Sequence, residues 1–123
     1  MSVGIAKKMT DCIFCKIGAG ALPSDTVYED EEIKVFKDLH PKAPVHLLVI
    51  PKEHVESVAH LRKAHELLVG RLVFAAKTVA ESLGLTGFKL VCNVGRDGGQ
   101  VIDHLHIHLL AGWKVAEERT SNV

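Results

Sequence analysis

Residues 104–110 constrain the fold more than any other part of this chain. Their sequence, His-Leu-His-Ile-His-Leu-Leu, alternates imidazole and aliphatic side chains. Successive side chains of a β-strand point to opposite faces, so a strand here places three imidazoles on one face and three aliphatic groups on the other. A helix would scatter the same histidines around its axis. The alternation therefore predicts a strand with one face in a core and the other in a site.

The face formed by His104, His106 and His108 indicates chemistry rather than packing. Buried imidazoles need hydrogen-bond partners and gain little from packing. Same-face neighbours lie about 6.6 Å apart along a strand, so three in a row converge poorly on one metal ion. The glycine-rich residues 95–99 lie upstream, where a loop can direct backbone N–H groups at an anion. An anion-binding site is the favoured interpretation, and a solvent-facing polar strip is the alternative.

Three short segments in the first half of the chain predict an antiparallel meander. Residues 26–28, 33–36 and 46–50 are rich in β-branched or aromatic side chains. Polar turns at residues 29–32 and 41–44 separate them, which is typical of strands joined by short connections.

The second half predicts a long helix followed by two more strands. Residues 60–83 carry apolar side chains at helical spacing, and Gly84 suits the end of such a helix. Residues 88–94 and 104–110 are predicted strands joined through the glycine-rich turn. Strands in runs around one helix predict an α+β fold with an antiparallel sheet.

The chain is predicted to form one domain. Its 123 residues are 47% hydrophobic, which suffices for one core and is too little for two. No repeat or linker divides the sequence. The predicted boundaries are a frayed terminus at residues 1–10, the folded domain at residues 11–114 and a flexible tail at residues 115–123.

Charge and hydropathy exclude several classes of partner. The formal net charge is zero, which argues against a nucleic-acid surface. No apolar run approaches the ~20 residues that span a bilayer, and residues 1–11 lack the features of a secretory signal. These features predict a soluble, cytoplasmic protein with neither a nucleic-acid nor a membrane partner.

The three cysteines are an odd-numbered and sparse set for a secreted disulfide scaffold. Cys12 and Cys15 form a Cys-x-x-Cys pair, which in a reducing compartment is a metal-binding or redox-active motif, or simply two buried thiols. Cys92 lies on an apolar strand and is expected to be a small buried hydrophobic residue. His40, His60 and His65 lie outside every motif and are expected to be solvent-exposed.

The segment at residues 104–110 matches the His-φ-His-φ-His-φ-φ signature, with φ apolar, of the histidine triad (HIT) family. The chain resembles this family over most of residues 11–112. The other similar stretches are residues 13–17, 35–38, 43–54 and 93–100. The spacing of Gly98-Gly99-Gln100 and the Gly112-Trp113 ending are similar to the nucleoside phosphoramidase branch. The resemblance implies a HIT-like fold, with a five-stranded antiparallel sheet, one long amphipathic helix and a short N-terminal helix.

The resemblance also implies a homodimer, with the long helix and a sheet edge paired across a two-fold axis. An exposed edge strand gives a physical reason for such pairing, because its backbone groups lack partners in the monomer.

For catalysis, the resemblance implies that His106 is the nucleophile and forms a covalent nucleotidyl-imidazole that water hydrolyses. A neutral imidazole near pH 7 suits this chemistry, and no metal is required for the chemical step. Donors to the phosphoryl oxygens are expected from His108, Gln100 and the backbone around Gly99 and Val101. The remaining candidates for catalytic roles are His46, which resembles the family's phosphate-side histidine, and His104.

The resemblance places the ribose hydroxyls of a purine nucleotide against Asp38, whose carboxylate can accept from a diol. The base is expected to contact the apolar residues Ile13, Phe14, Ile17, Phe36 and Leu39. Each of these taken alone is equally explained as core. Asn93 precedes the glycine loop and is a further candidate contact, with a turn-flanking role as the alternative.

Cys12 and Cys15 need two further ligands to complete a tetrahedral zinc site. The resemblance supplies His54 and His104, because some bacterial-type members carry a Cys-Cys-His-His site. A zinc ion held there would have a structural role outside the chemical step.

The predicted activity is hydrolysis or nucleotidyl transfer on purine nucleoside 5'-phosphoramidates, which makes the protein a hydrolase of phosphorus–nitrogen bonds. Two alternatives remain: a dinucleoside polyphosphate hydrolase, and a nucleotide-binding regulatory protein with little activity. The sequence departs from the branch at Val101, where a polar residue is common, and at Asp103, where an aromatic residue is usual. Both departures bear on contact with the leaving group.

Overall fold

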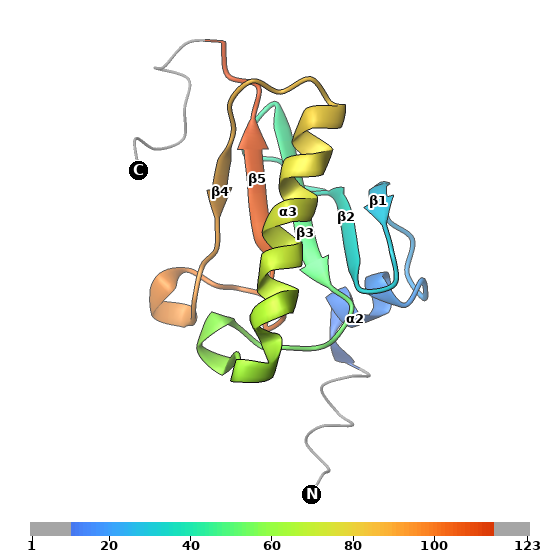
Figure 1. Ribbon diagram of the computed structural model, residues 1–123, viewed down its shortest axis with the longest axis vertical. Helices are drawn as coiled ribbons and strands as arrows, with labels where there is room; N and C mark the ends of the chain where they lie inside the picture. Colours follow the sequence, from blue (N-terminus) through green and yellow to red (C-terminus); the bar gives the residue numbers. More distant parts are fainter. Residues whose placement is uncertain (1–10, 115–123) are drawn as a thin grey trace, which may run out of the picture.

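The computed structural model describes residues 11–114, which form one antiparallel sheet with helices on its two faces (Figure 1). The predicted frayed segment at residues 1–10 and tail at residues 115–123 lie outside the described residues. The five strands lie in the order β1-β2-β3-β5-β4, and every neighbouring pair is antiparallel. Their bounds are β1 Thr26–Glu29, β2 Ile33–Lys37, β3 Val45–Pro51, β4 Lys89–Val91 and β5 Ile107–Ala111. The predicted α+β fold is confirmed.

The long helix α3, Glu66–Ser82, covers one face of the sheet (Figure 1). Its buried residues are Leu68, Leu72, Ala75, Ala76, Val79 and Ala80. Five of these join a core with alternate residues of the strands, including Ile33, Val35, Leu47 and Val49. The helix ends where Gly84 adopts a positive φ of 71°, as its sequence position predicted.

The predicted start of this helix at residue 60 is wrong. Two short 3-10 turns, Val58–His60 and Lys63–His65, come first. They are separated from each other because Leu61 and Arg62 have extended backbones, with ψ of 145° and 168°. The helical spacing of apolar residues therefore begins several residues before the helical backbone does.

The short helix α2, Ile13–Gly18, lies on the opposite side of the sheet from α3. Cys12 caps it, since its Sγ accepts a hydrogen bond from the Cys15 backbone N–H at 3.3 Å. Its buried side chains pack with the strand residues that alternate away from α3. This second core contains Phe14, Ile17, Phe36, Leu48 and Ile50.

The predicted strand at residues 104–110 starts later than expected, at Ile107. In the register that pairs Val49 with Ile107, Pro51 would stand opposite Leu105, and proline has no N–H to donate to a ladder. Leu105 N donates instead to Val55 O at 2.7 Å. The alternation nevertheless holds, because Leu105 lies in the α3-side core while His106 contacts Phe14 on the other side.

Two of the expectations for residues outside the motifs are confirmed, and one is wrong. His40 and His60 are exposed. His65 is buried: its Nδ1 accepts from Arg62 N at 2.9 Å, so its Nε2–H donates to Glu53 at 3.0 Å. Cys92 is partly buried against the α3-side core, and this burial raises the pKa of its thiol.

Within residues 11–114, the helices are all too short or too polar to cross a lipid bilayer.

Candidate functional site

His106 lies in the extended segment just before β5 and is held by the backbone of its neighbour. Its Nδ1 lies 2.7 Å from the His104 carbonyl oxygen. Because a carbonyl can only accept, the proton of the neutral ring is on Nδ1 and the lone pair is on Nε2. The Phe14 ring packs edge-on against the imidazole, with centroids 5.2 Å apart. The buried ring is therefore oriented with one nitrogen ready to act as a nucleophile.

His108 and His46 face each other across the β3–β5 pair. Lys42 N donates to His46 Nδ1 at 2.9 Å, so the lone pair of His46 is on Nδ1 and its proton is on Nε2. That Nε2–H donates to His108 Nδ1 at 2.9 Å, and Asp38 Oδ2, another acceptor, lies 3.4 Å from it. His108 must then carry its own proton on Nε2, where it can donate to a ligand.

Burial keeps both of these imidazoles neutral near pH 7. It lowers the pKa of His108 to about 4, with the neighbouring His106 and His46 adding to the effect. Burial also lowers the pKa of His46, against an opposing contribution from Asp38. A neutral pair can hold the donor and acceptor pattern described above, whereas a protonated ring would donate from both nitrogens.

The buried side chain of Gln100 holds the glycine-rich loop through hydrogen bonds to backbone groups. Its Oε1 accepts from Gly95 N at 2.8 Å, and its Nε2 donates to Glu56 O and Ile102 O at 2.7 and 2.9 Å. Both amide hydrogens are therefore used within the protein. Its side chain holds the loop, so any donor offered to a phosphate here comes from the backbone around Gly99, whose φ is 91°.

The predicted nucleoside contacts divide into two groups. Phe14, Ile17 and Phe36 are buried in the second core. By contrast, Ile13, Leu39 and Val101 expose 47%, 86% and 80% of their surface. The side chains of the exposed group are accessible to a ligand, whereas those of the buried group are packed in the second core.

The two polar residues of the nucleoside set are only partly buried. Asp38 Oδ1 accepts from His40 N at 2.8 Å, which leaves Oδ2 beside His46. Asn93 lies against the loop, where a Cβ at Gly99 would come within 3.9 Å of its Cγ. Asp38 therefore lies beside His46 and His108, and Asn93 lies beside the glycine loop.

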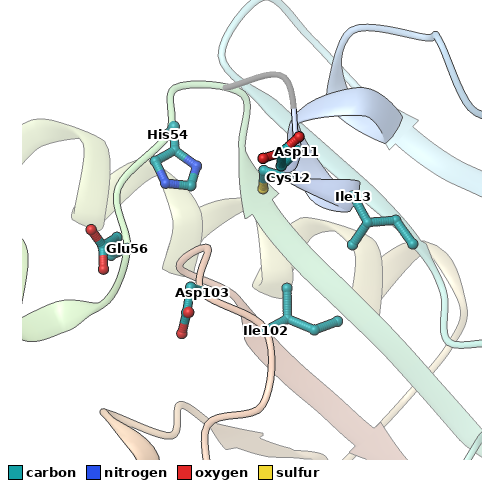
Figure 2. A pocket seen from close by; sticks show the side chains of 7 residues that line it. All are labelled: Asp11, Cys12, Ile13, His54, Glu56, Ile102 and Asp103. Carbon is teal, nitrogen blue, oxygen red and sulfur yellow. The ribbon is translucent and has the colours of Figure 1, made fainter. Parts of the chain in front are cut away.

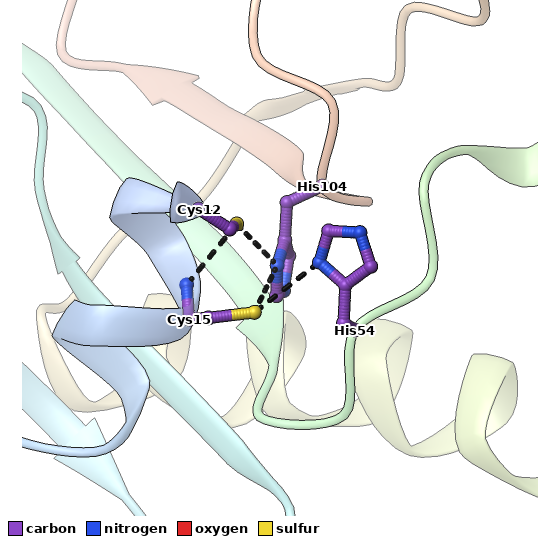
Figure 3. A group of neighbouring side chains, drawn as sticks. All are labelled: Cys12, Cys15, His54 and His104. Atoms are coloured by element: carbon purple, nitrogen blue, oxygen red, sulfur yellow. Dashed lines mark hydrogen bonds between the residues drawn. The ribbon is translucent and has the colours of Figure 1, made fainter. Parts of the chain in front are cut away.

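The four predicted metal ligands come together from three parts of the chain (Figure 3). Cys12 and Cys15 lie at the start of α2, His54 follows β3, and His104 precedes β5. Cys12 Sγ lies 3.2 Å from His104 Nδ1, and Cys15 Sγ lies 3.2 Å from His54 Nδ1 and 3.5 Å from His104 Nδ1. We call these four residues the Cys/His cluster.

The chemistry of the Cys/His cluster fits a tetrahedral metal ion. Its donor atoms all lie within 4.8 Å of one another, and Zn–S and Zn–N bonds of usual length separate neighbouring ligands by ~3.5 Å. His104 Nε2 donates to Pro51 O at 2.8 Å, which leaves the lone pair on the Nδ1 that faces the cysteines. Such a hydrogen bond to the second nitrogen is typical of metal-binding histidines.

The protonation states in the cluster depend on whether a cation is present. Burial, together with the neighbouring Cys12, raises the pKa of Cys15 to about 12, so the thiol stays protonated without a cation. A bound divalent ion would supply that charge and deprotonate the thiol. Burial lowers the pKa of His104 to about 4, which keeps its ring neutral, as a ligand must be.

A second group, Asp38, His46 and His108, also has its possible ligand atoms within 4.8 Å of one another. We call it the Asp/His cluster. Its hydrogen bonding does not suit a metal ion, because His46 Nε2, which faces the centre of the cluster, carries a proton. The Asp/His cluster is therefore a hydrogen-bonded group.

A cavity of about 300 Å³ opens beside the Cys/His cluster rather than over His106 (Figure 2). Its lining residues are Asp11, Cys12, Ile13, His54, Glu56, Ile102 and Asp103. Asp103, one of the two departures noted in the sequence, is held by a bidentate pair with Arg96 at 2.8 and 3.0 Å. Val101, the other departure, points no polar group at the site.

Several groups that orient the site carry no sequence signal. The Lys42 N–H, the Pro51 carbonyl and the His104 carbonyl set which nitrogen of His46, His104 and His106 holds the proton. All three are backbone groups. Arg96 is a side chain that the sequence analysis missed, and it braces the loop through Gln100 O at 2.7 Å.

Comparison with known proteins gives consistent matches over nearly all of the described chain. A family model described as "Scavenger mRNA decapping enzyme C-term binding" matches residues 11–120. Protein HitA of Neisseria gonorrhoeae is 50% identical over 103 residues, covering 83% of this chain and 96% of the relative. The purine nucleoside phosphoramidase of Escherichia coli is 39% identical over 104 residues, covering 83% and 87%.

Solved structures agree with these relatives. A histidine triad protein from Clostridium difficile has a TM-score of 0.83 at 44% identity, covering 85% of this chain and 93% of its own. A zinc-bound histidine triad family protein from Mycobacterium smegmatis has a TM-score of 0.76 at 25% identity, covering 90% and 81%. These matches agree with the five-stranded fold and with the hydrogen bonding of the three histidines. This chain therefore belongs to the histidine triad family.

Proposed function

We propose that this protein hydrolyses purine nucleoside 5'-phosphoramidates through a covalent nucleotidyl intermediate on His106. The observation that carries the proposal is the 2.7 Å hydrogen bond from His106 Nδ1 to the His104 carbonyl, which leaves the Nε2 lone pair available. The Escherichia coli purine nucleoside phosphoramidase, at 39% identity, supports the substrate class. Histidine triad relatives described as hydrolases support the reaction type.

In the first step, His106 Nε2 attacks the α-phosphorus, a P–Nε2 bond forms and the P–N bond to the leaving amine breaks. The ring becomes positively charged, and its Nδ1–H bond to the His104 carbonyl stabilises that charge. The amine takes a proton from water. In the second step, water attacks the same phosphorus, the P–Nε2 bond breaks and the ring becomes neutral again. The proton that the attacking water loses neutralises the hydroxide left by the first step. The sum is phosphoramidate plus water giving nucleotide plus amine.

His108 is suited to stabilise the phosphoryl oxygens during both steps. Within residues 11–114 its Nε2–H has no hydrogen-bond partner, and it is the last donor of the chain that starts at Lys42 N and passes through His46. A donor held in place before the reaction costs no reorganisation when charge develops. We therefore assign His108 to the phosphoryl group and His46 to holding His108.

For the nucleoside, we propose that Asp38 accepts from the ribose hydroxyls through Oδ2. The exposed aliphatic side chains of Ile13 and Leu39 would contact the base, above the buried floor of Phe14 and Phe36. Asn93 and the Gly99 backbone would face the phosphate side.

We further propose that the Cys/His cluster holds zinc and that the protein is a cytoplasmic homodimer. The zinc-bound neighbour and the donor geometry support the metal, and cysteines free of disulfides fit a reducing compartment. The apolar surface of Leu67 and Phe74 on α3, with Leu90 on the edge strand β4, supports a dimer. A monomer in sedimentation at micromolar concentration would contradict the dimer.

The activity is tested by release of AMP and free amine from an adenosine 5'-phosphoramidate. We expect His106→Asn to lower kcat by at least about three orders of magnitude while AMP still binds. His60→Asn, at an exposed histidine outside the site, is the matched control and should retain full activity. A native protein that binds AMP and leaves the phosphoramidate intact would contradict the proposal. Product profiling with a dinucleoside polyphosphate would then test the alternative substrate.

A further inference from the structure

The Cys/His cluster and His106 share one residue. The imidazole of His104 lies in the cluster through Nδ1, while its backbone carbonyl accepts the hydrogen bond that orients His106. His104 is fully buried, and its other nitrogen is fixed on Pro51 O. Whatever fixes the His104 side chain therefore also fixes the carbonyl that orients His106.

A second connection runs through Phe14, which lies between the two cysteines of the Cys-x-x-Cys pair. Its ring packs edge-on against both His104 and His106, with centroid distances of 5.9 and 5.2 Å. The helix that carries the ring, α2, has only six residues and is capped by a cysteine of the cluster. A shift of the cysteines would therefore move a ring that packs against His106.

The sheet does little to hold this part of the chain. The β3–β5 ladder reaches only as far as Ile107, and Pro51 ends β3 opposite Leu105. The backbone N–H groups of His104 and Leu105 bond to Ile102 O and Val55 O, both in loops. The residues on either side of the His104 carbonyl thus depend on contacts other than strand pairing, and the Cys/His cluster is the nearest crosslink.

We propose that a metal ion held by the Cys/His cluster positions His106 for attack, through the His104 backbone and the Phe14 ring. The proposal rests on the proposed function and adds that metal occupancy controls the rate of the chemical step. A bound metal ion would crosslink His104 Nδ1 to both cysteines, whose Sγ atoms lie 3.2 and 3.5 Å from it. Metal loss then loosens His106, while Phe36 on β2 and Asp38 directly after that strand stay in place.

The test compares the full-length protein loaded with zinc, stripped by a chelator under reducing conditions, and reloaded. Imidazole Cε1–H NMR signals report on His106 directly, assigned with His106→Asn, and exposed His60 is the internal reference. We expect the His106 signal to shift or broaden on metal removal while that of His60 stays unchanged. We expect kcat for the phosphoramidate to fall about 10- to 100-fold, KM to change much less, and zinc to restore both readouts. Cys92→Ser, which changes a cysteine outside the cluster, should behave like the native protein.

Unchanged His106 signals and unchanged kcat in a folded, metal-free protein would overturn the proposal, as would a native protein that binds no zinc. If metal removal unfolds the chain, exchange of zinc for cadmium makes the same comparison in the folded state, because cadmium–sulfur bonds are longer. A His106 shift exceeding that of His60 supports the proposal, and no shift overturns it. A protein without turnover whose His106 signals still follow the metal would contradict the proposed function alone.

Discussion

The Cys/His cluster and the Asp/His cluster lie on the same side of the sheet and contain similar metal-capable side chains, yet their chemistry is opposite. In the Cys/His cluster, His104 Nε2–H donates a hydrogen bond to Pro51 O, so the lone pair on Nδ1 faces the cysteines. In the Asp/His cluster, Lys42 N–H donates to His46 Nδ1, so the Nε2–H of His46 faces the centre. One backbone acceptor and one backbone donor thus distinguish a cluster that could hold a metal from a chain of hydrogen bonds.

The largest expected effect is on metal binding. Cys15→Ser should abolish stoichiometric zinc and lower the free energy of unfolding by about 3 to 4 kcal/mol at zinc concentrations 100 to 1,000 times the Kd. His46→Gln should keep its zinc. Metal analysis of the purified proteins with urea denaturation checks both. Zinc retained in Cys15→Ser and lost in His46→Gln would reverse our comparison.

The next effect is on catalysis through the Asp/His cluster. His46→Leu removes the donor to His108 Nδ1, so the His108 proton is no longer confined to Nε2, and we expect kcat to fall about 10²-fold. His46→Gln can still donate from its amide and should recover part of that loss. Nitrogen-15 shifts of His108 should report an Nε2–H tautomer in the native protein and a mixture in His46→Leu. Equal kcat values in the two variants would argue against the tautomer mechanism.

A smaller effect should follow from the backbone donor itself. Lys42→Pro removes the N–H that fixes His46, and loss of one such hydrogen bond is worth about 1 kcal/mol, or several-fold in kcat. Lys42→Ala retains the N–H and is the matched control. The measurement is kcat of both variants beside the native enzyme. If Lys42→Ala loses as much as Lys42→Pro, the side chain rather than the backbone is responsible.

The smallest effect concerns stability at acid pH. The pKa of His108 is about 4 in the folded protein and ~6.5 when unfolded, so only the unfolded state binds this proton between those values. The stability from its neutral form is complete above pH 6.5 and is lost as pH falls toward 4. Because His108 is only partly buried and solvent screens its charge, we expect a slope well below the full-burial value of about 1.4 kcal/mol per pH unit. His108→Gln should show a shallower loss in urea denaturation at pH 7 and pH 5. Parallel losses in both proteins would refute this assignment, because any zinc release at low pH affects both alike.

Much of the fold was predictable because its signals are periodic. The alternation in residues 104–110 and the helical spacing before Gly84 gave a sheet and one long helix. The predicted first residues of the last strand and of the long helix were wrong, because the backbone geometry there departs from the periodic pattern. Pro51 ends the ladder before His106, and the extended backbone of Leu61 and Arg62 delays the helix.

The exposure of the histidines shows the same limit. His65 was expected in solvent, but the backbone of Arg62 and the side chain of Glu53 satisfy both of its ring nitrogens, which allows burial. His60, five residues earlier, is exposed although its Nδ1 lies 2.8 Å from Ser57 Oγ and its Nε2 lies 3.8 Å from Glu56. Ring partners therefore permit burial without requiring it, and the fold around each ring decides its exposure.

The sequence by itself determined the fold class, the family and the residue types that gather at the site, because side-chain identity and spacing are written in it directly. Only the tertiary structure decided which nitrogen of each histidine carries a proton, and hence which cluster can bind a metal. The physical reason is that backbone N–H and C=O groups recur at almost every residue, so sequence cannot single out the few that matter. Folding selects them by placing Lys42 N, Pro51 O and His104 O against particular imidazoles.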